Sequence, residues 1–166
     1  MIEIVELCDH PEVGPLLARW HAAEWSHLYD EWDEDAARTE FASMSQPGRV
    51  PTTYVAFEGR RRDLGAVLGS ISIVETDDLA GFEHLTPWLA SLYIREDRRG
   101  SGVGSLLVAH LVEQARRMSL TRLHLFTAGQ EAYYAAKGWE VLARVSVHDE
   151  PAAVMALRLD QPIPPT

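Results

Sequence analysis

Hydrophobic and polar residues along the chain follow two periods that mark out its elements. Alternating or short apolar runs, rich in β-branched and aromatic residues, predict seven strands. These lie at residues 2–6, 52–57, 66–75, 87–94, 122–127, 139–147 and 152–159. Apolar residues at helical spacing predict four helices. These lie at about residues 11–28, 33–44, 104–118 and 130–137.

Three local signals refine these elements. Pro11 marks the start of the first helix, and Thr127-Ala128-Gly129-Gln130 has the pattern of a capping box for the last one. Gly69, inside a predicted strand, indicates a bulge or a close approach of another part of the backbone.

The order of the elements predicts an α/β (α+β) fold with a mixed sheet and helices on both faces. Because a helix joins residues 87–94 to residues 122–127, these strands should be parallel neighbours with a right-handed connection. A ligand would then lie at their carboxyl ends. The length of 166 residues suits one domain, predicted over residues 1–160, and residues 161–166 form a proline-rich tail.

A glycine-rich turn, Arg99-Gly100-Ser101-Gly102-Val103-Gly104, leads from a predicted strand into a predicted helix. Its glycines let a ligand approach the backbone, and the helix start presents unpaired N–H groups and a positive dipole end. This arrangement suits a pyrophosphate, with Arg98 and Arg99 adding positive charge. The spacing matches neither the dinucleotide fingerprint nor a nucleotide P-loop, so by itself it leaves a ligand-free tight turn open.

A second pattern follows about 25 residues later, where a strand leads into a short helix that contains Tyr133 and Tyr134 and ends at Gly138-Trp139. Together the two patterns resemble the GNAT superfamily of acyl-CoA-dependent N-acyltransferases over roughly residues 66–145. The matches to its Arg/Gln-x-x-Gly-x-Gly/Ala loop are Arg99, Gly102 and Gly104, with Gly100 as an extra glycine. Tyr134 matches the tyrosine that the family places four residues before a Gly-aromatic pair.

The resemblance implies a mixed, mostly antiparallel sheet of about six or seven strands, in which strands 87–94 and 122–127 splay apart around the pantetheine arm. It implies an N-acetyltransferase that moves an acetyl group from acetyl-CoA, its co-substrate, directly to a primary amine of a small molecule or a peptide N-terminus. The residues expected to bind acetyl-CoA are Leu92, Tyr93, Ile94, Arg99, Gly100, Ser101, Gly102, Val103, Gly104, Ser105, Thr127 and Tyr133.

Tyr134 is expected to protonate the leaving thiolate, because a phenol with a pKa of about 10 can donate a proton to it. A tyrosine on a short amphipathic helix can equally pack its ring in the core. An acceptor ammonium must lose a proton before it attacks, so a base is also expected. Its candidates, among which the sequence does not choose, are His21, Glu24, Glu75, Glu83 and His84. Four early aromatic residues either line the acceptor pocket or belong to the core: Trp20, Trp25, Tyr29 and Trp32.

The composition of the chain limits the classes of molecule that it is expected to bind and the location in which it is expected to work. A formal net charge of −10 argues against nucleic-acid binding, which needs a basic face, and favours cationic amines. We expect no membrane segment, because no apolar stretch reaches the ~20 residues of a bilayer span. The acidic N-terminus does not have the pattern of a signal peptide, and a single cysteine, Cys8, fits a reducing compartment, so a cytoplasmic location is expected. No His/Cys pattern indicates a metal site, and a homodimer is left open.

A second functional class is a non-catalytic coenzyme A-binding or ligand-sensing module of the same fold. Tyr134 favours the enzyme, because a sensor needs no proton donor at that position. A nucleotide-binding regulator is disfavoured, because the loop has no Gly-Lys-Ser/Thr and no acidic ribose ligand follows it.

Overall fold

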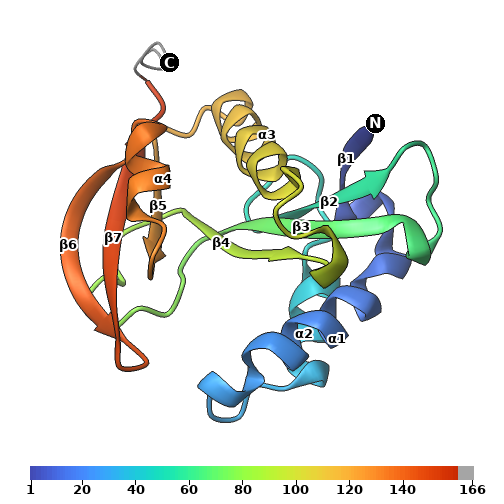
Figure 1. Cartoon of the computed structure of the whole chain (residues 1–166), viewed down its shortest axis with the longest axis horizontal. Helices are drawn as coiled ribbons and strands as arrows, with labels where there is room; N and C mark the ends of the chain where they lie inside the picture. The colour runs from blue at the N-terminus through green and yellow to red at the C-terminus, as the bar shows by residue number, and fades with distance from the viewer. Residues whose placement is uncertain (161–166) are drawn as a thin grey trace.

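The computed structural model describes residues 1–160, which form one seven-stranded sheet (Figure 1). Its strands are β1 (Ile2–Glu6), β2 (Thr52–Glu58), β3 (Val67–Val74), β4 (Trp88–Ile94), β5 (Arg122–Thr127), β6 (Glu140–Val147) and β7 (Glu150–Arg158). The strand order is β1-β2-β3-β4-β5-β7-β6, and within the described residues every neighbouring pair is antiparallel except β4 and β5. The predicted mixed sheet, with its one parallel pair, is confirmed.

Helices cover both faces of the sheet, as predicted. They are α1 (Gly14–Trp25), α2 (Glu34–Ser43), α3 (Val103–Arg117) and α4 (Glu131–Ala136). Alternate residues of β2 belong to two different cores: Val55 packs in the core of α1 and α2, and Tyr54 in the core of α3 and α4. This division follows from the period of two in a strand, because neighbouring side chains point to opposite faces.

The first helix is shorter than its apolar pattern suggested. Pro11 opens a single 3₁₀ turn, Pro11–Val13, and the α-helix begins at Gly14. At its other end, Trp25 is followed by a second 3₁₀ turn, Ser26–Leu28. Both turns lie inside the predicted helix 11–28. The apolar pattern did not separate them from the α-helix, because 3₁₀ and α-helical spacing place nearly the same residues on one side of a short segment.

The predicted capping box before α4 is wrong. The residue that precedes the helix is Gln130, whose side chain makes no capping hydrogen bond, and Thr127 still belongs to β5, where it pairs with Ala153. Between them Gly129 adopts a left-handed conformation with φ of 97°. Thr127 is therefore held in the sheet, and the chain turns before the helix starts. The predicted tail, residues 161–166, lies outside the described residues.

Candidate active site

The parallel strands β4 and β5 meet at only one end. Their single register pair in the described chain is Trp88 with His124, after which β4 continues along β3 and β5 continues along β7. Although β4 is a central strand, residues 91–94 are exposed or half-buried, whereas residues 88–90 are buried. The carboxyl half of β4 therefore lies open on the side that faces β5, and its backbone groups there have no strand partner.

A bulge in β4 lies where this opening begins. Tyr93 pairs with Ser70 and Ala90 with Ser72, so two residues of β4 oppose one residue of β3. The first of the two, Ser91, has a φ of 55°, which is unusual for a residue other than glycine. Bulges bend a strand and increase its twist, so this one helps to turn the end of β4 away from β5.

Gly69 of β3 lies both at a bulge and at a close approach of another part of the backbone, the two features that a glycine inside a strand predicted. It lies beside a register shift between Ala56 and Phe57 of β2. A Cβ atom at Gly69 would lie only 2.4 Å from the carbonyl oxygen of Tyr93. A side chain here would push the open end of β4 out of place, because real Cβ atoms do not approach backbone oxygens so closely.

The glycine loop follows β4 and ends at the start of α3. Gly100 and Gly102 have φ values of 75° and 93°, in the left-handed region that favours glycine. Gly102 immediately precedes α3, and no side chain of residues 1–160 caps the first turn of this 15-residue helix. A Cβ atom at Gly102 would have none of the described chain's atoms within 4 Å beyond its own neighbours in sequence, so the space above the loop is open among these residues. Uncapped N–H groups, a positive dipole end and open space together fit an anion such as a pyrophosphate.

The two arginines of the loop lie against carboxylates of the chain itself. Arg98 Nη1 lies 2.9 Å from Glu58 Oε1, and Arg99 Nη2 lies 3.6 Å from Glu24 Oε2. Arg99 also donates a hydrogen bond from Nε to the carbonyl oxygen of Ile94 at 3.0 Å, and its guanidinium carbon lies 5.4 Å from the centre of the Tyr93 ring. In this structure Arg99 thus links the glycine loop to α1.

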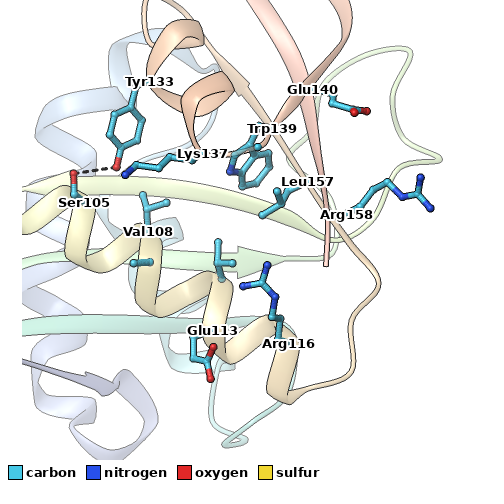
Figure 2. Close-up of a pocket in the computed structure, with 13 residues that line it drawn as sticks. Ser105, Val108, Glu113, Arg116, Tyr133, Lys137, Trp139, Glu140, Leu157 and Arg158 are labelled. Atoms are coloured by element: carbon cyan, nitrogen blue, oxygen red, sulfur yellow. Dashed lines mark hydrogen bonds between the residues drawn. The ribbon is translucent and has the colours of Figure 1, made fainter. Parts of the chain in front are cut away.

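The neighbouring tyrosines of α4 point in different directions. The rings are nearly perpendicular, at 84° with centroids 5.0 Å apart. Tyr133 lies toward α3 and donates a hydrogen bond of 3.0 Å to Ser105 Oγ in the first turn of that helix (Figure 2). Tyr134 lies in the core, 7% exposed, with its ring centroid 5.7 Å from that of Trp139.

Tyr134 shares this core with the strands of the opening. Leu125 of β5 belongs to the same cluster, and Leu92 and Ile94 of β4 pack against it. Burial, followed by the nearby Tyr133 phenol, raises the pKa of Tyr134 to about 12. Within the described chain, burial does not leave the Tyr134 hydroxyl oxygen stranded without a hydrogen-bond partner. At neutral pH this phenol therefore keeps its proton.

The four early aromatic residues separate into two groups. Trp20 and Trp25 pack on Tyr93 of β4, with ring centroids 5.4 Å and 6.0 Å away. Tyr29 and Trp32 lie further along, after the 3₁₀ turn Ser26–Leu28 and before α2, and their ring centroids are 6.0 Å apart. The first group thus belongs to the packing of α1 on the open end of β4.

The second group reaches the other half of the sheet. The Tyr29 ring centroid lies 5.0 Å from that of His148 in the turn between β6 and β7. Figure 1 shows this turn and the connection between α1 and α2 at the same end of the molecule. Burial, and then the charges of Asp77 and Asp78, raise the pKa of Tyr29, so the loop after β3 lies here too.

Two of the candidate bases have clear environments. His21 is 2% exposed and lies on the buried face of α1, with Nε2 3.3 Å from Ser70 Oγ, so it has little access to an acceptor. Burial lowers the pKa of His21 to about 4, which keeps the imidazole neutral at pH 7. The Glu24 carboxylate forms an ion pair with Arg99.

Asp77, half-buried in the loop after β3, is a further candidate that was not among the expected bases. Burial raises the pKa of Asp77 to about 7, and the charge of Asp78 adds to the rise. A carboxyl group with a pKa near neutrality can exchange protons at physiological pH. The two adjacent acids were the available sequence signal, but the partial burial of Asp77 depends on where the loop after β3 lies in the folded protein.

Two structural findings bear on the composition-based expectations. Within residues 1–160, the His, Cys, Asp and Glu side chains form no group of three that could hold a metal ion. Across the same residues, every helix is too short or too polar to cross a membrane.

Comparison with known proteins gives the family. The family model described as "Acetyltransferase (GNAT) family" matches residues 16–139 of this chain. These residues include the β4–β5 opening, the glycine loop and α4. This chain belongs to the GNAT acetyltransferase family. Among curated proteins, no sequence matches it significantly.

Solved structures share its fold. An aminoglycoside 6'-N-acetyltransferase complexed with coenzyme A superposes with a TM-score of 0.67 at 15% identity, covering 96% of this chain and 98% of that one. The ribosomal-protein-S18-alanine N-acetyltransferase from Escherichia coli has a TM-score of 0.65 at 18% identity, covering 98% and 96%. A GNAT-family acetyltransferase from Streptococcus pneumoniae has a TM-score of 0.65 at 16% identity, covering 95% and 99%. At these identities the likeness establishes the fold.

Proposed function

We propose that this protein is an acetyl-CoA-dependent N-acetyltransferase that transfers the acetyl group directly to a primary amine of a small molecule or a peptide N-terminus. The observation that carries this proposal is the opening between β4 and β5, with the glycine loop at the end of β4 and Tyr134 in the core that both strands share. Family membership and the coenzyme A bound by a protein of the same fold support it.

The cofactor's pyrophosphate would be held chiefly by backbone. The first turn of α3 has no side-chain cap, so its N–H groups are available to phosphate oxygens. Gly100 and Gly102 hold the loop in a shape that leaves those groups uncovered. Arg99 would add charge once its guanidinium leaves Glu24, because it lies at the start of the same loop.

Transfer requires the amine nitrogen to attack the thioester carbonyl carbon while the carbon–sulfur bond breaks. Unpartnered backbone N–H groups on the open side of β4, around Leu92 to Ile94, would polarise the carbonyl oxygen. Tyr134 would then give its phenolic proton to the departing thiolate. Its pKa of about 12 keeps this proton in place until the thiolate forms.

The acceptor would enter between the α1–α2 connection and the β6–β7 turn. Carboxylates gather on the three segments that meet there: Asp30, Glu31, Asp77, Asp78, Asp149 and Glu150. Within the described residues, every ion pair uses other carboxylates. Negative charge without internal partners favours a cationic acceptor, and Asp77 would take the proton that the ammonium loses, directly or through water.

A thiol-release assay with acetyl-CoA tests the proposal across amino acids, polyamines, aminoglycosides and peptides with free N-termini. We expect release that depends on both protein and acceptor, with cationic amines preferred, and an acetylated amine detected by mass spectrometry. Calorimetry with coenzyme A accompanies it. Binding of coenzyme A without turnover of any amine would instead support the non-catalytic coenzyme A-binding module, and absence of binding would overturn both.

A further inference from the structure

A histidine of β5, His124, links the two parallel strands at the narrow end of their opening. The carbonyl oxygen of Pro87, the residue before β4, lies 3.0 Å from the His124 backbone nitrogen and 3.0 Å from its ring nitrogen Nδ1. A carbonyl oxygen can only accept, so Nδ1 carries a proton and donates it to this hydrogen bond. The backbone and the ring of one β5 residue thus hold the same oxygen at the start of β4.

The other ring nitrogen of His124 is buried without a use in the fold. Nε2 has no hydrogen-bond partner among residues 1–160, and the residue is 3% exposed. Burial lowers the pKa of the His124 imidazole, so at neutral pH the ring is neutral with its proton on Nδ1. An unpaired buried nitrogen costs stability, and an apolar ring would avoid that cost. Stability alone therefore does not explain the histidine, and its Nδ1–H bond to Pro87 is what an apolar ring would lack.

Aromatic neighbours hold the imidazole in place. The Trp88 ring, 1% exposed, has its centroid 5.7 Å from that of His124 and 6.4 Å from that of Phe126. Trp88 is itself fixed, because its Nε1 donates a hydrogen bond of 2.7 Å to the carbonyl oxygen of Leu85. The ring of His124 is thus packed as well as bonded, and its contact with Pro87 is a rigid one.

The position of this contact gives it leverage on the open end of β4. Trp88 and His124 form the single register pair of β4 and β5 in the described chain, and the strands separate beyond it. Leu92 lies four residues further along β4, about 13 Å away at the rise of an extended strand. A rotation of about 5° at the register pair would therefore move the Leu92 backbone by about 1 Å. A misplacement of about 1 Å at a reacting centre can lower a rate by about 10²-fold.

We propose that His124 is a positioning residue for acetyl transfer. Its Nδ1–H bond to the Pro87 carbonyl oxygen fixes the angle at which β4 leaves β5, and with it the place of the backbone N–H groups around Leu92 that polarise the thioester carbonyl. This inference rests on the proposed function, because it takes those N–H groups as the polarising groups. His124 acts through the backbone of β4 rather than on the reacting atoms.

Two substitutions at this position test the role of the Nδ1–H group in the full chain. His124→Phe keeps an aromatic ring but removes the donor, whereas His124→Asn places an amide N–H near the position of Nδ1. Single-turnover transfer from acetyl-CoA to the best amine of the thiol-release assay gives the rate, and calorimetry gives the coenzyme A affinity. We expect His124→Phe to lower the rate by about tenfold to 10²-fold, with affinity changed by less than about threefold. His124→Asn should restore the rate to within about threefold of the unaltered protein.

His110→Phe is the matched control, because it makes the same substitution at a half-buried histidine whose ring packs on Tyr54, with centroids 5.0 Å apart. It should keep the rate. Urea unfolding of each variant confirms that the folded protein is being compared.

Three results would overturn this inference while leaving the proposed function standing. The first is a full rate in His124→Phe. The second is an equal loss in His124→Asn and His124→Phe, which would show that an N–H group at the Nδ1 position is not sufficient. The third is a parallel loss of rate and coenzyme A affinity in His124→Phe, which would indicate general damage to the fold. Absence of transfer by the unaltered protein to any amine would instead overturn the proposed function.

Discussion

Gly69 of β3 lies so close to Tyr93 of β4 that a Cβ atom on the glycine would come within 2.4 Å of the tyrosine carbonyl oxygen. Tyr93 belongs to the open end of β4, so this contact sets the position of the proposed acetyl-CoA site. We expect Gly69→Ala to destabilise the protein by about 1–3 kcal/mol, as overpacking does, and to weaken coenzyme A binding. Urea unfolding and calorimetry measure the two effects.

Gly14→Ala is the control for this prediction. A Cβ atom at Gly14 would lie 3.7 Å from the Phe41 Cβ, an ordinary contact, and the residue is helical. Alanine should therefore leave stability unchanged or slightly higher. If Gly69→Ala binds coenzyme A as tightly as the unaltered protein, the position of Tyr93 does not control the site.

Gly102→Val should weaken coenzyme A binding by about tenfold or more, because the side chain would stand over the first turn of α3. Gly81→Val supplies a matched comparison. The two glycines have φ values of 93° and 88°, and a Cβ atom at either would have open space around it. Both variants carry similar backbone strain. Calorimetry should find a loss only at Gly102, and an equal loss at both would show that strain, rather than blockage of the loop, weakens binding.

Tyr134→Phe should lower the rate of acetyl transfer by about 10²–10⁴, the range for loss of a general acid, with little change in acetyl-CoA affinity. Single-turnover measurement is needed, because product release can hide a chemical defect. In the unaltered protein the phenol should still act at pH 10, since burial raises its pKa to about 12. Tyr54→Phe, in the buried part of β2, removes another hydroxyl as the control. Full turnover by Tyr134→Phe would mean that the thiolate leaves without this proton.

Glu24→Gln should release Arg99 toward the phosphates. The Glu24–Arg99 pair is wide, at 3.6 Å, and about half exposed on both sides, so its loss should change stability by less than about 0.5 kcal/mol. Coenzyme A affinity should rise by up to about fivefold. In an Arg99→Gln background the same substitution should have no effect. A rise that persists without Arg99 would indicate simple removal of negative charge.

His21 should make the protein less stable in acid. Its pKa is about 6.5 in an unfolded chain and about 4 in the folded protein, so the unfolded state binds the proton first as pH falls. The free energy of unfolding of the protein is therefore unaffected by His21 above pH 6.5. It falls by up to about 3 kcal/mol as the pH drops toward 4. Urea unfolding of His21→Gln should show a flatter pH dependence over this range. His84→Gln, at an exposed position, should leave the dependence as it was, and identical curves for both variants would contradict the assignment.

The sequence alone determined the elements and the two motifs, because these depend on residues close together in the chain. Period-two and helical spacing are set by neighbours within four residues, and they predicted the strands, the helices and the parallel connection around the glycine loop. The spacing of Tyr134 before Gly138-Trp139 indicated the family, and family membership is shown. The capping box failed because Thr127 remains in the ladder with Ala153, a contact that spans 26 positions.

Only the tertiary structure decided which distant groups meet. The bulge at Ser91 depends on the register of β4 against β3, and the raised pKa of Asp77 depends on where the loop after β3 lies in the folded protein. Likewise, Arg99 reaches Glu24, and His124 reaches the Pro87 carbonyl oxygen, because packing brings separate elements together. Such contacts depend on the positions of whole elements, which no pattern within one segment of the chain records.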